Sequence, residues 1–177
     1  MLLTWILSRS YEALMAVLKV VEYPHSVLKK QAKVVTTIGV KERRLIQDMV
    51  DTLYHEDGVG LAAPQVGISK RIIVISPRAL PGEERVYLNP EILARSPEEE
   101  LGLEGCLSLP GISGEVPRAK RIKFQAMDLN RSLVTEEAEG FRARVIQHEI
   151  DHLNGILLID RLDFARKQVL VSARARL

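Results

Sequence analysis

The sequence has very little cysteine and no long uninterrupted hydrophobic segment. Its 177 residues include one cysteine, Cys106, so an internal disulfide is impossible and a reducing compartment is the natural setting. A single cysteine is, by itself, most often a small buried apolar residue. The apolar segment at the N-terminus, residues 1–7, falls far short of the roughly 20 residues that a membrane-spanning helix needs. We therefore expect no association with a membrane.

An excess of charge of one sign is also lacking. The chain has 25 basic and 23 acidic side chains and a formal net charge of +2, which gives no reason to expect specific recognition of a nucleic acid. Apolar residues make up 46% and charged residues 27%, as is typical of a soluble globular protein. The length suits one domain, and no repeat, low-complexity segment or Gly/Ser linker divides it.

The N-terminal segment has neither a basic start nor a small-residue cleavage site, so a signal peptide is not expected. Met15 begins a segment, residues 15–21, that alternates like the first strand of a domain. We interpret Met15 as the natural start, residues 1–14 as an extension, and residues 15–177 as a single domain. An additional N-terminal helix is the alternative.

The spacing of apolar residues predicts an α+β fold. Helices are predicted at residues 41–56 and 141–153, and a short basic helix at residues 163–177. Strands are predicted at residues 71–75, 86–88, 92–94 and 121–127, followed by a turn at 128–131 and a hairpin partner at 133–138. Repeated strand–helix crossovers are not visible. We therefore expect antiparallel strands in small sheets, packed around a central metal-binding helix at about residues 141–154.

The strongest local signal is the segment His148-Glu149-Ile150-Asp151-His152. Two histidines four residues apart lie on one face of a helix, so both imidazoles can reach one metal ion. Glu149 can then lie over a metal-bound water. A solvated polar helix face is the alternative. Apolar residues share the histidine face, however, and burying histidines without partners would be costly.

A catalytic site of this type needs a third protein ligand and an open fourth position. No histidine follows at the metzincin spacing and no glutamate follows Glu149, so the third ligand must lie upstream. Cys106 is the candidate, because a thiolate with two imidazoles suits zinc or ferrous iron. The glycine-rich segment at residues 58–67 is not a phosphate loop, since no Gly-Lys-Ser/Thr follows. It is a simple turn unless Gln65 directs its amide into a site.

Three segments in order resemble the motifs of the peptide deformylase family. They are Gly58-Val59-Gly60-Leu61-Ala62-Ala63-Pro64-Gln65, Glu104-Gly105-Cys106-Leu107-Ser108 and Gln147-His148-Glu149-Ile150-Asp151-His152. The resemblance extends from Val17 to about Leu162. It implies that residues 15–177 form a catalytic domain that removes the formyl group from the N-terminal formyl-methionine of nascent proteins.

The resemblance also implies a role for each motif. One divalent metal ion is held by Cys106, His148 and His152. Fe2+ is expected as the native ion, with Zn2+, Ni2+ or Co2+ as alternatives. Glu149 takes the proton of the attacking water and gives it to the leaving amine. The side-chain amide of Gln65 and the backbone N–H of Leu107 stabilise the charge that grows on the formyl oxygen.

The resemblance further implies contacts with the substrate. The backbone of Gly60 contacts the peptide, and the methionine pocket is formed by Val59, Phe141, Val145, His148 and Arg144. Arg144 stands where many relatives carry an aliphatic residue, so its charged head lies either at the pocket rim or in solvent. Residues 111–115 lack the arginine that some relatives offer to the substrate backbone. Glu104 and Arg118 form a supporting ion pair, or are two ordinary surface charges.

Other functions remain open from sequence alone. A zinc endopeptidase of the His-Glu-x-x-His type is one alternative. A non-catalytic metal domain that binds nascent chains or ribosomes is another, and a closed structural site would need His25 or His55 as its fourth ligand. A basic C-terminal cluster would make transient ribosome contact, or is a solvated helix face; it comprises Arg161, Arg166, Lys167, Arg174 and Arg176. We expect a bacterial cytoplasmic protein, with an organelle as the alternative if residues 1–14 are genuine.

Overall fold

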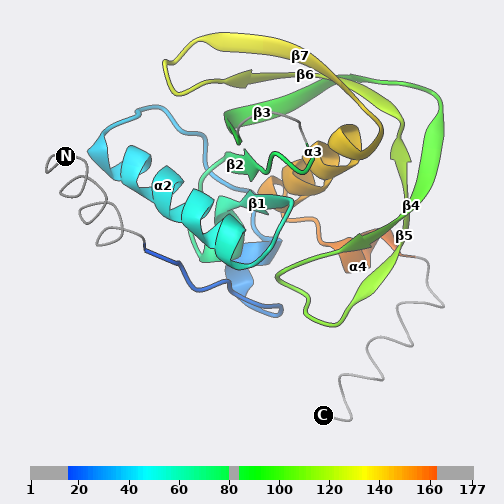
Figure 1. Cartoon of the computed structure of the whole chain (residues 1–177), viewed down its shortest axis with the longest axis horizontal. Helices are drawn as coiled ribbons and strands as arrows, with labels where there is room; N and C mark the ends of the chain where they lie inside the picture. The colour runs from blue at the N-terminus through cyan, green and yellow to red at the C-terminus, as the bar shows by residue number, and fades with distance from the viewer. Residues whose placement is uncertain (1–15, 80–83, 163–177) are drawn as a thin grey trace, which may run out of the picture.

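Two antiparallel sheets surround helix α3 (Gly140–Leu153) in the computed structural model, which describes residues 16–79 and 84–162 (Figure 1). The five-stranded sheet has the order β1-β2-β3-β6-β7. Its strands are β1 (Gly60–Ala62), β2 (Ile72–Ile75), β3 (Arg85–Arg95), β6 (Arg121–Met127) and β7 (Leu133–Glu139). The second sheet pairs β4 (Glu99–Gly105) with β5 (Ser113–Ala119). The predicted α+β class with small antiparallel sheets is confirmed.

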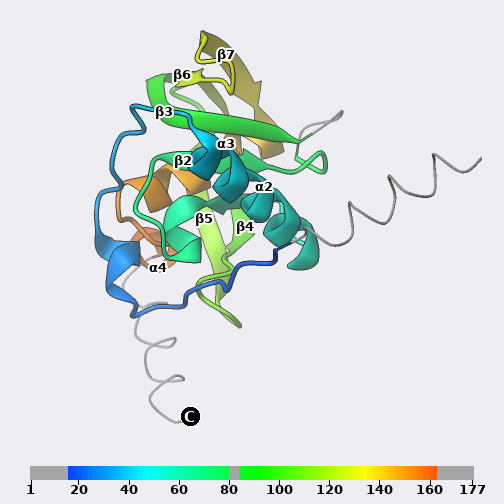
Figure 2. The same ribbon diagram turned by 90° about the vertical axis from the view of Figure 1, so that its left-hand side faces the viewer.

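The two long helices pack on the side chains of strand β2. Ile73 and Ile75 pack in the cluster with α3, whereas Ile72 and Val74 pack in the cluster with α2 (Val40–His55). Successive side chains of a strand point to opposite faces, so α2 and α3 cover opposite faces of the sheet at β2. In both views α3 lies inside the molecule and α2 along its outside (Figure 2). Burial on both faces accounts for the uninterrupted apolar run.

Short helical segments complete the frame around α3. They are the 3-10 helices η1 (Ser26–Lys29) and η2 (Ala63–Val66) and the helix α4 (Leu158–Arg161). A third apolar cluster joins η1 and α4 to Val116 of β5 and the partly buried Cys106. The loop after β4 is therefore held against the C-terminal end of the described chain. No described helix is long and apolar enough to cross a membrane.

The strands predicted at residues 86–88 and 92–94 are confirmed as strand, but their division into two elements is wrong, because one strand, β3, runs through both. Its pairing with β6 shifts register after Leu88 and again after Ile92. Pro90 cannot donate to the ladder, and such a residue is tolerated where pairing is irregular. Asn89 adopts a positive φ of 51°, and its side chain hydrogen-bonds the backbone N–H and C=O of Val35 at 2.8 Å each. The bulge is thus fixed by a distant loop.

Most of the other predicted helices and strands are confirmed, and one predicted strand is wrong. Helices 41–56 and 141–153, the strands at 71–75 and 121–127, and the 133–138 hairpin partner are confirmed within a residue or two. The predicted first strand at 15–21 is wrong: the described part, 16–21, joins no ladder, although the backbone N–H of Val21 donates to the carbonyl of Gln65. The proposed extension at 1–14 and the basic helix at 163–177 lie outside the described residues.

Candidate metal centre and active site

Three metal-ligand side chains converge at the centre of the molecule. His148 and His152 are buried one turn apart on α3, with ring centroids 4.9 Å apart. Cys106 directly follows β4, and its Sγ lies 3.2 Å from Nε2 of His152. One ligand atom from each residue falls within 4.8 Å of the others. One sulfur and two imidazole nitrogens at this spacing fit a zinc or ferrous ion.

The second ring nitrogen is held by a partner in His148 only, because Nδ1 of His152 is buried and has no hydrogen-bond partner among the described residues. Oε2 of Glu104 accepts a hydrogen bond from Nδ1 of His148 at 2.9 Å, which leaves Nε2 of His148 for a metal. Burial opposes the protonated form of His148, yet hydrogen bonds to Cys106 and Glu104 raise its pKa to about 10. Metal binding at Nε2 therefore displaces a proton. Burial lowers the pKa of His152 well below its ordinary value, which favours the neutral ligand form.

Behind His148 lies a buried charge network. The guanidinium of Arg118 donates to both oxygens of Glu104 at 2.9 Å, so the predicted ion pair is present and is buried rather than on the surface. Another nitrogen of Arg118 donates to Asp151 at 2.5 Å. Burial works to raise the pKa of Glu104, but hydrogen bonds from His148 and Arg118 hold it at about 2. Glu104 is therefore an anion that fixes the His148 ring.

Glu149 lies beside the ligands with its carboxylate almost completely buried. Its Oε2 has no hydrogen-bond partner among the described residues, and burial raises its pKa to about 7. Strand β1 passes close to this carboxylate. A Cβ at Gly60 would come within 2.5 Å of Oε1 of Glu149. Gly60 is thus required to make room for Glu149, a constraint that the sequence did not reveal.

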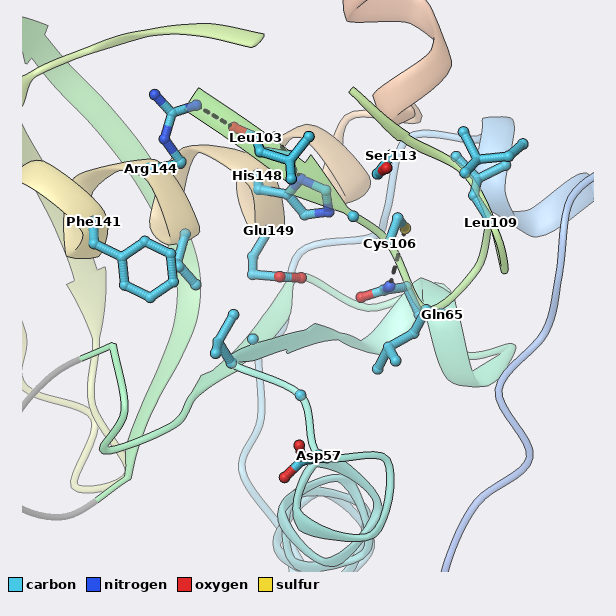
Figure 3. Close-up of a pocket in the computed structure, with 18 of the residues that line it drawn as sticks. Asp57, Gln65, Leu103, Cys106, Leu109, Ser113, Phe141, Arg144, His148 and Glu149 are labelled. Atoms are coloured by element: carbon cyan, nitrogen blue, oxygen red, sulfur yellow. Dashed lines mark hydrogen bonds and ion pairs between the residues drawn. The ribbon is translucent and has the colours of Figure 1, made fainter. Parts of the chain in front are cut away.

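Gln65 is fixed by the backbone of its own loop. The N–H of Ala62 donates to Oε1 of Gln65 at 2.8 Å, so the amide nitrogen faces the other way, 3.7 Å from Sγ of Cys106 (Figure 3). The segment around Gln65 is more than the simple turn that was the alternative, since it forms β1 and η2. Its amide points into the site, as a donor to a developing oxyanion must.

A cavity of about 600 Å³ opens in front of these groups. Its volume lies in the usual range for small-ligand sites, about 300–1,000 Å³. Among its lining residues are Val59, Gly60, Gln65, Glu104, Cys106, Leu107, Phe141, Arg144, Val145, His148 and Glu149. Figure 3 shows Gln65, Cys106, His148 and Glu149 directed toward one another, with Phe141 to one side. Phe141 is 53% exposed, so it borders the mouth rather than the floor.

Arg144 lies beside the cavity and not in solvent. Its side chain borders the cavity but is buried, and its guanidinium donates to backbone carbonyls of β4 and β5 and to Glu104. The alternative that places the charged head in solvent is therefore wrong, whereas the position beside the cavity agrees with the other alternative. Phe141 and Arg144 point in different directions from α3 (Figure 3). Four polar partners within reach explain why burial is tolerated here.

Two further residues differ from their sequence interpretation. Arg161, counted with the basic C-terminal cluster, pairs with Asp151 of α3 at 2.5 Å. Asp151 thus accepts hydrogen bonds from both Arg118 and Arg161. This role of Asp151 was not predicted from the sequence, although the residue lies inside the histidine motif.

His25 accepts a hydrogen bond from the N–H of Val27, and His55 is exposed beside Glu56. Neither histidine joins the ligand cluster that the described residues form, so a closed structural site finds no support.

Comparison with known proteins agrees with this arrangement. The family model described as polypeptide deformylase matches residues 17–168. Peptide deformylase of Thermotoga neapolitana is 50% identical over 144 residues, covering 81% of this chain and 86% of that protein. Peptide deformylase of Natranaerobius thermophilus is 47% identical over 151 residues, covering 84% and 94%.

Solved structures give the same result. A peptide deformylase from Legionella pneumophila matches with a TM-score of 0.85 and 38% identity, covering 91% of this chain and 95% of that one. A Met-Ala-Ser-bound class I type b peptide deformylase from Acinetobacter baumannii matches with a TM-score of 0.80 and 40% identity, covering 83% and 99%. With the matched region spanning the ligands, Glu149 and the cavity, the chain belongs to the polypeptide deformylase family.

Proposed function

We propose that this protein is a metal-dependent hydrolase that removes the formyl group from the N-terminal formyl-methionine of nascent proteins. The observation that carries the proposal is the convergence of Cys106, His148 and His152 beside the buried, unpartnered carboxylate of Glu149. Family membership supports the same activity. In the reaction, the oxygen of water bonds to the formyl carbon, the C–N bond breaks, and formate and a free amine are released.

Cys106, His148 and His152 are proposed to hold one divalent ion. When bound, the ion supplies Lewis-acid activation of water, lowering its pKa from about 16 toward about 7. Fe2+ is the proposed native ion, and Zn2+, Ni2+ and Co2+ are other ions that a thiolate with two imidazoles accepts. The bond from His148 to Glu104 supports this ligand set, because it fixes the ring with its other nitrogen toward Cys106.

Glu149 is proposed as the group that moves the proton. Its carboxylate takes the proton of water and returns it to the leaving amine as the C–N bond breaks. Burial raises the pKa of Glu149 toward neutrality in the absence of an ion, which is the direction that favours a group able both to accept and to donate a proton. The glycine at position 60 leaves space for this carboxylate in the cavity.

Two donors are proposed for the negative charge on the formyl oxygen. They are the Nε2 of Gln65 and the backbone N–H of Leu107, and losing such a donor costs about 3–4 kcal/mol of transition-state stabilisation. Gln65 supports this role because Ala62 already holds its Oε1, so only the amide nitrogen is turned to the site.

The cavity is proposed to select methionine. Val59, Phe141 and Val145 supply apolar surface beside His148, and the backbone of Gly60 is proposed to contact the peptide. The Met-Ala-Ser ligand of the Acinetobacter baumannii relative is consistent with a short peptide in this place. We further propose residues 15–177 as the catalytic domain, transient ribosome contact through the basic tail, and a bacterial cytoplasmic location.

The proposal is tested by formate release from formyl-Met-Ala-Ser. The protein is purified without oxygen, loaded with ferrous iron, and compared with Glu149→Ala at equal metal content. Release by the parent protein that falls at least about a hundredfold in the variant is expected for a proton-transfer group. No release by a parent protein that holds one ion per chain would refute the hydrolase and favour a binding role.

A further inference from the structure

A buried arginine extends the histidine face of α3. Arg144 lies one turn before His148 and two turns before His152, so the three side chains follow one stripe of the helix. Its side chain is 9% exposed, which is rare for an arginine without a partner. The two histidines are proposed metal ligands, whereas Arg144 has no role in the proposed reaction.

The guanidinium of Arg144 joins both strands of the small sheet. Nη1 donates to the carbonyl oxygens of Val116 at 2.8 Å and Gly102 at 3.3 Å, and Nη2 donates to the carbonyl of Glu100. Gly102 and Val116 are paired in the ladder between β4 and β5. The same Nη1 donates to Oε1 of Glu104 at 2.8 Å. Arg144 therefore couples α3, β4, β5 and the carboxylate of Glu104 in one set of contacts.

Glu104 receives four hydrogen bonds, and their distribution determines its orientation. Oε1 accepts from Arg118 and Arg144, whereas Oε2 accepts from Arg118 and His148. Arg144 thus satisfies the oxygen that does not touch the imidazole. Without it, the carboxylate could turn toward other donors, and the His148 ring would lose its fixed partner.

A glycine in the middle of β4 makes this arrangement possible. A Cβ at Gly102 would come within 2.8 Å of Cζ and Nη2 of Arg144 and 2.9 Å of Nε. Glycine normally weakens a strand interior and often marks a close approach of another group. At position 102 the group that approaches is the guanidinium, so the strand is built to receive it.

We propose that Arg144 is a positioning residue of the metal centre, which orients His148 through Glu104 by tying that carboxylate to β4 and β5. The inference rests on the proposed function, since it concerns the same ligand set. The alternative is that Arg144 only braces the wall of the cavity, in which case substrate binding alone depends on it.

The test measures metal binding without substrate. Arg144→Leu removes the guanidinium, and Gly102→Ala displaces it while keeping its charge, so the second variant also covers the case in which the first does not fold. Arg142→Leu is the matched control, because Arg142 lies on the same helix and is partly buried against Tyr87 and Glu136, away from Glu104. Each protein is titrated with Co2+ in anaerobic buffer, following the thiolate and ligand-field absorption bands.

We expect Arg144→Leu and Gly102→Ala to raise the Co2+ dissociation constant about tenfold and to shift the bands, as loss of an outer-shell partner does, with Arg142→Leu near the parent protein. The two changes combined should be far from additive, because both break the same contact. With formyl-Met-Ala-Ser, kcat should fall about tenfold while KM changes by less than about threefold.

Parent-like Co2+ affinity and bands in both Arg144→Leu and Gly102→Ala would overturn the proposal, as would an equal loss in Arg142→Leu or a change confined to KM. The outcome is separable from the fate of the proposed function. A parent protein that binds Co2+ but releases no formate would refute the hydrolase and leave the comparison of Co2+ affinities intact.

Discussion

At the scale of single residues, the contact between Gly60 and Glu149 is the tightest constraint on the site. Alanine at position 60 would place a methyl carbon 2.5 Å from the carboxylate oxygen, which must then move. The fold should survive, because the atoms that clash are the end of a side chain. We predict that Gly60→Ala lowers kcat at least about a hundredfold, the scale of a misplaced proton-transfer group. Steady-state kinetics, beside a thermal melt, check this; parent-like kcat would contradict it.

Gln65 offers a separate residue-scale prediction. In Gln65→Glu, one carboxylate oxygen still accepts from the N–H of Ala62, but the donor that faces Cys106 becomes an acceptor. We expect kcat to fall by about 10²–10³-fold, as for other lost oxyanion donors. In Gln65→Leu, which adds no charge, kcat should fall by a similar factor. Retention of most activity in both variants, at full metal content, would remove Gln65 from the mechanism.

Residue identity in the site was partly predictable from sequence. The candidate metal ligands, Glu149 and Gln65 lie in short contiguous motifs, so their spacing on a helix or loop made them recognisable locally. The burial and the partners of Arg144 were not predictable, for a physical reason. The burial of an arginine depends on its partners, and Glu104 with the β4 carbonyls lies 40 or more residues away in sequence. No local pattern predicts such a partner set.

At the scale of elements, the end of α3 is held by Arg71, which precedes β2. Its Nη1 donates to the carbonyl of Leu153 at 3.3 Å and to Oδ1 of Asn154 at 2.9 Å, and its Nη2 donates to the carbonyl of Pro90 at 3.0 Å. Carbonyls at a helix C-terminus lack partners within the helix, so this side chain supplies one. It also joins the helix end to the bulge of β3.

We predict that Arg71→Ala lowers the free energy of unfolding by about 1–3 kcal/mol, because it leaves several acceptors without a donor. Amide exchange should quicken in the last turn of α3, which carries His152. The matched control is Arg43→Ala, whose partner is the exposed carbonyl of Leu129 and which should cost less than about 0.5 kcal/mol. Equal losses in the two variants, by urea denaturation, would contradict this account.

Elements with strong local periodicity were predictable, and those that depend on distant contacts were not. The spacing of apolar residues located α2, α3 and the β6–β7 hairpin because each buries one face, and it located β2 as a continuous apolar run because both faces of that strand are buried. The continuity of β3 through Pro90 depends on Asn89, whose side chain bonds to Val35, 54 positions earlier. The alternating residues 16–21 follow a strand-like pattern but join no ladder and instead bond to α2 and η2, so periodicity alone could not exclude a strand.

At the scale of the whole molecule, a metal ion would join the two sheets through their shared helix. Cys106 belongs to the loop after β4, whereas His148 and His152 belong to α3, which packs on the five-stranded sheet. An ion that binds the folded state but not the unfolded state stabilises the folded state by about 4 kcal/mol when the free ion concentration is a thousand times the dissociation constant. We therefore predict that chelation lowers Tm and that restored metal recovers it. An identical Tm with and without metal would contradict a ligand set that spans both parts.

The fold class and the order of the motifs were predictable at this scale, but the cavity was not. Its wall combines β1, β4, the loop after β4 and α3, and those segments meet only through the sheet topology. Sequence could therefore name the candidate catalytic and metal-binding groups without showing the space in which a peptide would lie.

This protein is proposed to hydrolyse the formyl amide rather than internal peptide bonds. The most direct measurement compares formyl-Met-Ala-Ser with acetyl-Met-Ala-Ser and a longer blocked peptide, using protein that carries one ferrous ion per chain. We predict stoichiometric formate and free Met-Ala-Ser from the first peptide, with no internal cleavage of the others. Internal cleavage of the blocked peptide without formate release would contradict the account and indicate an endopeptidase instead.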